Sequence, residues 1–262
     1  MTRLLFLGNS HLAAIKDAST RYADRFEGVE ITCVGAHKMG LLDTDVQGSI
    51  LRPATESARE AFRTLGGVSE VDLKSYDAVT LCGCGMAFSR ALWLWRKARW
   101  FDLPSASSTD GSDWTLISRA AYDAMLQSAL VDVLAGRLLR HLRRATDRPI
   151  LVASQPRTAE AVLTTTGNSL SAHKPLLNQG DAPAVNAAFE WNADLVCEAL
   201  GGRFLSQPAQ SVTQDVLTRE TFTNGAVRLS AQGRYAQPED DLLHANAAYG
   251  ALVIKQVVEA VA

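Results

Sequence analysis

A serine near the start of the chain and an acid–histidine pair near its end are the residues best suited to chemistry. Ser10 follows an apolar run, Leu4–Leu7, that stops at Gly8, and a helical pattern starts directly afterwards. A serine on such a turn is a nucleophile if a base reaches it, and the free N–H groups of a helix N-terminus stabilise a developing anion. The alternative is that Ser10 only caps the helix.

Asp241 and His244 stand three residues apart, immediately before the last helical pattern. A carboxylate and an imidazole at this spacing can face each other across a turn. The carboxylate then holds the tautomer of the ring and stabilises the imidazolium, as in a Ser-His-Asp triad. The pair therefore supplies what Ser10 lacks by itself, which is a general base oriented by a third group.

The segments LFLGNSH and DLLHAN together resemble the first and last motifs of the SGNH (GDSL-type) hydrolase family. Residues 8–10 match the G-D-S of the first block, with asparagine in place of aspartate. Asp241 and His244 match D-x-x-H, and Asn246 fits the family's H-x-N. The resemblance covers most of the chain and implies a Ser-His-Asp triad that hydrolyses esters. Family precedent and a cluster of aromatic residues favour acetylated carbohydrate as the substrate class.

The resemblance also implies three oxyanion donors. They are the backbone N–H of the serine, the N–H of a glycine after the second strand, and an asparagine in G-x-N-D after the third. Gly35 or Gly40 could be the glycine, and we favour Gly35 because it directly ends the strand. Gly85 stands where the asparagine would be. The third donor is then either absent, or supplied by the backbone N–H of Gly85 or by a side chain from a neighbouring loop. Gln155 directly follows the fourth predicted strand and is our candidate for that side chain.

Short apolar runs alternate with helical patterns, which indicates an α/β fold with a mostly parallel sheet and helices on both faces. The resemblance implies a flavodoxin-like, three-layer α/β/α arrangement with strand order 2-1-3-4-5. Ligands of such sheets bind outside the carboxyl ends of the strands, where Ser10 lies. The predicted strands are Arg3–Leu7, Glu30–Val34, Asp77–Cys82, Pro149–Ala153 and Gly202–Leu205. The predicted helices are Ser10–Arg25, Ala54–Leu65, Ser118–Ala145 with a break near Gly136, Pro183–Leu200 and Asn246–Val261.

We predict a single domain over residues 1–262 in which three segments interrupt the alternation. Residues 87–117 hold four of the five tryptophans. Trp93 and Trp100 are spaced as on one helix face, which fits helix packing and a substrate wall equally well. Residues 221–238 favour a small hairpin around Asn224-Gly225.

The third interruption, residues 164–181, is polar and is predicted to be a loop. It contains Gly167-Asn168-Ser169-Leu170-Ser171, which is closer by letters to G-D-S-x-S than the N-terminal block. Ser169 follows a polar stretch rather than a core strand, so we favour Ser10 as the nucleophile. His37 and His173 are predicted to lie in loops at the rim of the site. His11 is expected to point away from Ser10 and not to be the base, and contact with substrate and a solvated position at the helix start are equally open for it.

Composition excludes several classes of protein. The chain has 26 basic and 28 acidic residues, a net charge of −2, which argues against a nucleic-acid footprint. No apolar run reaches the length of a bilayer and no cleavage site follows the first one, so we expect neither a membrane span nor a signal peptide. The four cysteines have no paired framework, which favours a cytoplasmic protein with reduced thiols.

Two rival functions stay open. A chain that lacks the asparagine at Gly85 could be an SGNH-fold binding protein with weakened catalysis. Gly83-x-Gly85 after a strand is also part of the G-x-G-x-x-G of nucleotide-binding oxidoreductases, although Phe88 stands at the third glycine. For the hydrolase we expect no cofactor and no metal, because Cys82-x-Cys84 has no second ligand pair. Its partner would be a small-molecule or carbohydrate ester.

Overall fold

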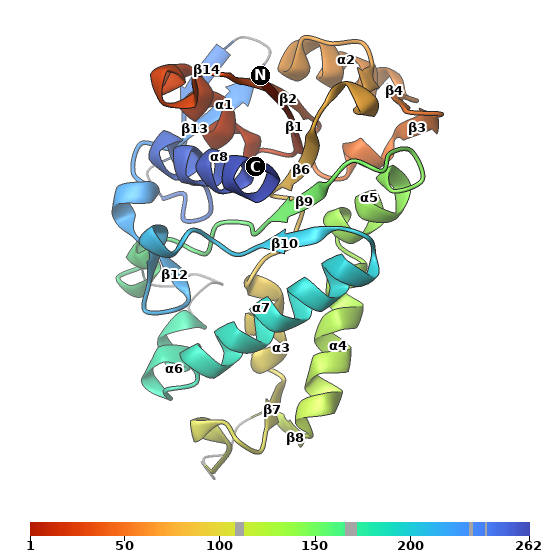
Figure 1. The fold of residues 1–262 in the computed structure, drawn as a ribbon. Coiled ribbons are helices and arrows are strands. Elements are labelled where there is room, and N and C mark those ends of the chain that lie inside the picture. Colours follow the sequence, from red (N-terminus) through yellow and green to blue (C-terminus); the bar gives the residue numbers. More distant parts are fainter. Residues whose placement is uncertain (108–112, 166–171, 231–232, 239) are drawn as a thin grey trace.

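The computed structural model describes residues 1–107, 113–165, 172–230, 233–238 and 240–262, and its centre is a five-stranded parallel sheet (Figure 1). The strands of this sheet are β1 (Thr2–Gly8), β2 (Val29–Gly35), β6 (Ala78–Cys82), β9 (Ile150–Ala153) and β10 (Arg203–Leu205). Their order is β10-β9-β6-β1-β2, and every neighbouring pair is parallel. Counted within this sheet alone the order is 2-1-3-4-5, and counted over all strands it is 2-1-6-9-10. The two counts differ because short strands that the sequence patterns do not predict lie outside the sheet.

The described residues also contain eight α-helices, nine short strands and eight short 3₁₀- or π-helical segments. The helices are α1 (Leu12–Arg21), α2 (Glu56–Ala61), α3 (Ser89–Trp95), α4 (Arg119–Val131), α5 (Leu134–Leu142), α6 (His173–Asn178), α7 (Ala182–Ala199) and α8 (Ala247–Val261). The short strands are β3 (Thr44–Gln47), β4 (Ile50–Pro53), β5 (Val71–Asp72), β7 (Ala98–Trp100), β8 (Thr115–Ile117), β11 (Val212–Thr213), β12 (Leu217–Thr218), β13 (Val227–Ser230) and β14 (Gly233–Ala236). None of the helices in these ranges combines the length and the apolar character needed to cross a membrane.

The two faces of the sheet are covered by different helices, as the side chains of β1 show. Leu4 and Phe6 pack with α1 and α8, whereas Leu5 and Leu7 belong to the larger cluster on the opposite face, which includes α5. All four side chains are fully buried. Alternate residues of a strand point to opposite faces, so a continuous apolar run is what a sheet covered on both sides requires.

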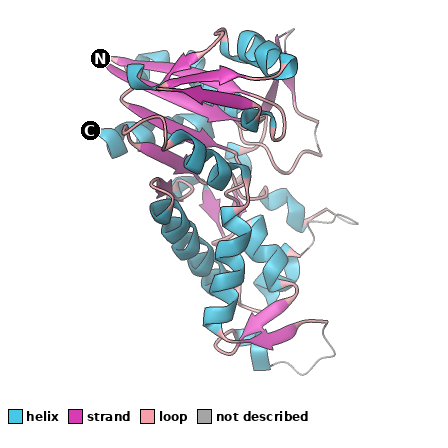
Figure 2. Ribbon diagram, turned by 90° about the vertical axis from the view of Figure 1, so that its right-hand side faces the viewer, coloured by secondary structure: helices cyan, strands magenta, loops and turns pink. Residues whose placement is uncertain are grey.

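The predicted aromatic interruption forms a lobe beyond the sheet. Helices α3, α4 and α7 pack on one another there, with β7 and β8 at the far end (Figure 1, Figure 2). The ring centroids of Trp100 and Tyr122 lie 4.7 Å apart in its interior. The buried side chains of the lobe are continuous with the core on the Leu5 face of the sheet.

The prediction that Trp93 and Trp100 lie on one helix face is wrong, because the two residues do not share a helix. Helix α3 ends at Trp95 and the chain turns into β7, so Trp100 is 2% exposed whereas Trp93 is 62% exposed. The buried guanidinium of Arg99 stacks 3.5 Å above the ring of Trp95 and pairs with Asp181 at 3.7 Å. These contacts favour the strand over continuation of the helix.

The predicted long helix at residues 118–145 is two helices, α4 and α5. The break lies at Asp132 and Val133 rather than near Gly136. The N–H of Ala135 donates to the carbonyl of Cys84 at 2.8 Å, so the start of α5 is anchored to the loop after β6. A Cβ at Gly136 would overlap the carbonyl of Val131, which explains the glycine next to the break.

Two smaller predictions also need correction. A hairpin exists, but it is β13–β14 with Val227 opposite Ala236, and Asn224-Gly225 forms an earlier turn. The predicted loop at residues 164–181 contains helix α6, and Ser169 lies outside the described residues.

Candidate active site

Ser10 lies at the junction of β1 and α1, at the carboxyl edge of the sheet. A Cβ at Gly8 would overlap the carbonyl oxygen of Cys82, so only glycine lets the end of β1 lie this close to β6. Helical bonding starts at once, because the N–H of Leu12 donates to the carbonyl of Asn9 at 3.0 Å. The N-cap residue of α1, His11, makes no side-chain capping bond, and Ser10 is exposed. The hydroxyl of Ser10 is therefore not used as a helix cap.

The Ser10 hydroxyl meets the predicted acid–histidine pair. Its Oγ lies 2.8 Å from Nε2 of His244, and Nδ1 of the same ring lies 2.6 Å from Oδ2 of Asp241. An ionised carboxylate only accepts hydrogen bonds, so Nδ1 carries the proton and donates to Asp241. Nε2 is then the acceptor for the serine hydroxyl, which is the tautomer that a general base requires.

Asp241 is fixed from its own backbone. Its Oδ1 accepts from the N–H groups of Leu243 at 2.8 Å and His244 at 3.1 Å. Burial alone would raise the pKa of this carboxyl, but the N–H of Leu243 and the imidazole of His244 hold the pKa below its usual value. The carboxylate thus stays ionised and keeps one oxygen on the ring.

The first turn of α8 holds the segment of His244 in place. Oδ1 of Asn246 caps α8 by accepting from the N–H of Ala248 at 3.0 Å, and its Nδ2 donates to the carbonyls of Thr221 and Asn224. Helices α1 and α8 cross closely, because a Cβ at Gly250 would overlap the carbonyl of Ala14. The packing of these two helices therefore sets the separation of the serine and the histidine, which are 234 residues apart.

Asn9, which takes the place of the aspartate in the G-D-S motif that this segment resembles, joins two strand ends. Its Nδ2 donates to the carbonyl of Gly83, and its Oδ1 accepts from the N–H of His11 at 3.3 Å. The loop after β6 is thereby tied to the turn that carries Ser10. The asparagine side chain is occupied in this role.

His11 is a part of the site that the sequence did not predict. Its ring stacks on that of His244, with centroids 4.7 Å apart and planes inclined by 24°, instead of pointing elsewhere. Burial, with a smaller contribution from the neighbouring His244, lowers the pKa of His11 to about 3. Its Nδ1 is buried and has no partner among the described residues. His11 is therefore a neutral ring that covers one face of the base.

The predicted oxyanion residues lie in two different cavities. Gly35 lines a cavity of about 220 Å³ together with Ser10 and His244. Gly85 and Gln155 instead line a separate cavity of about 470 Å³ beside the exposed Trp93. The structure therefore brings Gly35 to the nucleophile's cavity but not the other two.

Local geometry explains this division. Gly85 has a φ of +81°, and a Cβ there would lie 3.1 Å from Cβ of Val133, so the position favours glycine and not the family's asparagine. The backbone N–H of Gln155 donates to the carbonyl of Met86 at 2.9 Å, which fixes the start of the loop after β9. Of the two predicted rim histidines, His37 lines the cavity of Ser10, whereas His173 starts α6 and is buried.

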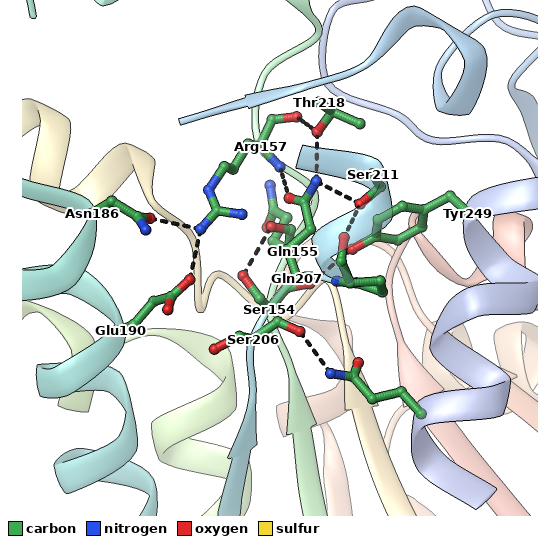
Figure 3. Close-up of polar contacts among 12 residues, drawn as sticks. Ser154, Gln155, Arg157, Asn186, Glu190, Ser206, Gln207, Ser211, Thr218 and Tyr249 are labelled. Carbon is green, nitrogen blue, oxygen red and sulfur yellow. Dashed lines mark hydrogen bonds and ion pairs between the residues drawn. The ribbon is translucent and has the colours of Figure 1, made fainter. Parts of the chain in front are cut away.

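A second polar cluster follows β9 and was missed in the sequence. Nη2 of Arg157 donates to Asn186 at 2.6 Å and to Glu190 at 2.8 Å, and its backbone N–H donates to Gln207 at 2.7 Å (Figure 3). The guanidinium is buried, and burial lowers its pKa although Glu190 acts in the opposite direction. Asn186 and Glu190 lie on α7, so Arg157 fastens the loop after β9 to that helix.

No group of three or more metal-ligating side chains occurs in the part of the chain that the structure describes. Cys82 and Cys84 are free and buried, and burial raises the pKa of the Cys84 thiol to about 12. Among the described side chains, the hydroxyl of Ser10, the imidazole of His244 and the carboxylate of Asp241 are joined by hydrogen bonds in that order. Such a series is suited to acyl transfer. Comparison of the sequence with protein-family models and with curated proteins finds no match. Inferences about function therefore rest on the geometry of these side chains.

Proposed function

We propose that the protein is a serine hydrolase of the SGNH type that cleaves an ester. The observation that carries the proposal is the hydrogen-bonded series Ser10–His244–Asp241 at the carboxyl edge of the sheet, with Ser10 exposed to a cavity. The parallel sheet with helices on both faces agrees with the flavodoxin-like arrangement of that family. The residues come from opposite ends of the chain and meet only in the fold.

Each member of the series has a step in the proposed reaction. Oγ of Ser10 attacks the ester carbonyl carbon while Nε2 of His244 takes its proton. The tetrahedral intermediate collapses when the ester C–O bond breaks, and His244 returns the proton to the leaving alcohol. His244 then deprotonates a water molecule, which attacks the acyl carbon. The bond from this carbon to Oγ of Ser10 breaks, His244 returns the proton to Oγ, and the acid and free Ser10 are released. Asp241 stabilises the imidazolium in both halves of the reaction.

The oxyanion donors in this proposal are the backbone N–H groups of Ser10 and Gly35. A third donor from Gln155 is not supported, because Gln155 lines a different cavity. Removal of one donor costs about 10²–10³ in turnover in known cases. We therefore expect a slower enzyme than one with the complete set, and acetylated carbohydrate remains our proposed substrate class.

The nucleotide-binding alternative loses its main support in this arrangement. A Cβ at Gly83 would lie within 2.7 Å of Oδ1 of Asn9 and would also overlap the ring of His11. The glycine is thus explained by the packing of these two side chains. The weakened binding protein is left as the rival, and activity decides between the two.

Labelling with a neutral alkyl fluorophosphonate, mapped by mass spectrometry, tests the proposal. We expect the label on Ser10 in the wild type, none in Ser10→Ala, and retained labelling in Ser169→Ala, the matched control at the other candidate serine. Hydrolysis of an aryl acetate should follow the same pattern. Absence of labelling and of hydrolysis would favour the binding protein, and a label on Ser169 would mean that the nucleophile was wrongly chosen.

A further inference from the structure

The cavity beside Ser10 is lined in part by residues that the proposed triad does not use. Lys16 and Arg228 line it together with Ser10, His244 and Gly35. Its volume of about 220 Å³ is below the range of drug-sized ligand pockets, so it suits a small group attached to the ester. The two cations come from different elements, α1 and β13, which pack on each other.

The ammonium of Lys16 makes one hydrogen bond to the described residues. Its Nζ donates to the carbonyl of Leu65 at 2.7 Å, which leaves two of its three N–H donors for another acceptor. Its charge reaches the cavity interior, because it opposes the burial that raises the pKa of the Cys33 thiol to about 12. Cys33 lines the same cavity.

Arg228 is exposed and has no hydrogen-bond or ion-pair partner among the described residues. Within the described part of the wall no aspartate or glutamate lines the cavity. The carboxylate of the site, Asp241, is hydrogen-bonded to His244. Two positive charges therefore face a small cavity next to the nucleophile without a compensating acid.

We propose that the ester carries an anionic group, such as a carboxylate, that binds against Lys16 and Arg228. This inference rests on the proposed hydrolase function and adds the charge of the substrate to it. Charge-assisted hydrogen bonds from an ammonium and a guanidinium are the natural partners of a carboxylate, and a cavity lined by one sign of charge concentrates such a substrate. Leu12, Ala13 and Leu65 also line the cavity, and their apolar side chains suit the short aliphatic part of that group.

Two matched pairs of esters test the charge on either side of the scissile bond. On the acyl side, 4-nitrophenyl hydrogen succinate is compared with its methyl ester. On the alcohol side, 4-acetoxybenzoate is compared with methyl 4-acetoxybenzoate. After the uncatalysed rates are subtracted, we expect kcat/KM to favour the anionic member about tenfold or more in one pair. The preference should shrink between 0.01 and 0.5 M salt because exposed charges are screened.

Variants connect the preference to the two cations. Arg228→Glu and Lys16→Gln should each lower the anionic-to-neutral ratio about five- to tenfold. Lys255→Gln, an exposed lysine of α8 outside this cavity, is the matched control and should leave the ratio unchanged. Fluorophosphonate labelling of Ser10 is measured in each variant, so that loss of the whole site is separated from loss of charge preference.

The outcomes separate the inference from the function on which it rests. Ser10 labelling together with no anionic preference in either pair, or with a preference that neither cation variant reduces, would overturn the inference and leave the hydrolase standing. Absence of Ser10 labelling would overturn the hydrolase and the inference with it.

Discussion

Two regions of the same sheet edge use polar side chains in opposite ways. At the end of β1, Ser10 is exposed to a cavity and its partners arrive from the far end of the chain. At the end of β9, Arg157 is 3% exposed and its bonds lead to side chains of α7. The first arrangement leaves an atom free to react, whereas the second uses its donors to fasten a loop. A polar residue that follows a strand is therefore available for chemistry only where the packing leaves it facing a cavity.

The largest effect should come from Asp241→Asn. Without the carboxylate, the ring of His244 loses the partner that fixes its tautomer, and we expect kcat to fall about 10⁴-fold with the fold retained. Asp240→Asn, at the exposed neighbouring position, is the matched control. Turnover on an aryl acetate and thermal unfolding measure the two properties, and similar turnover in the two variants would contradict the triad.

At the end of β9 we expect a substitution to reduce stability rather than activity. Arg157→Met removes a buried cation that pairs with Glu190 and bonds Asn186, and we expect a loss of about 2–4 kcal/mol in the free energy of unfolding. Labelling of Ser10 should be nearly unchanged at a temperature where the variant is folded. A large loss of labelling in the folded variant would show that the two regions are coupled.

His11 gives the stability a pH dependence that its replacement should remove. The pKa of His11 is lowered from 6.5 to about 3 by burial, so between these values the unfolded chain binds a proton that the folded chain does not. Stability from this group is complete above pH 6.5 and is lost as the pH falls towards 3. His11→Phe keeps a stacked ring without titration, so its Tm should fall less between pH 7.5 and 4.5 than that of the wild type. Equal falls would contradict the burial of a neutral His11.

The smallest effect should come from Gln155→Ala. Gln155 and Ser10 line different cavities, so kcat and KM for a small ester should change less than about twofold. A sharp loss of kcat with unchanged KM would mean that Gln155 reaches the transition state after all.

The sequence predicts those parts of the site that follow from strand ends and short spacing. Ser10 directly follows an apolar strand, and Asp241 and His244 lie within one turn, so their placement depends on local structure and on the parallel sheet. The five strands of the sheet are predicted to within one residue. For β1 and β9 the reason is a continuous apolar run, which a strand covered on both faces requires.

The remaining features depend on contacts between segments distant in the sequence. His11 stacks on a ring 233 positions away, and no local pattern reports this. Gly85 and Gln155 do follow strands, but a left-handed turn at Gly85 and a backbone bond from Gln155 to Met86 place them in the other cavity. The prediction that Trp93 and Trp100 share a helix face is wrong because α3 ends at Trp95, where the buried Arg99 stacks on the ring.

The rate at which a neutral fluorophosphonate modifies Ser10, compared between the wild type and His244→Ala, tests the central claim most directly. The hydroxyl lies 2.8 Å from Nε2 of His244, so removal of the imidazole should slow modification by about 10³-fold or more while the fold is retained. Ser10 modified equally fast in both proteins would contradict the account, because the serine would then react without its base.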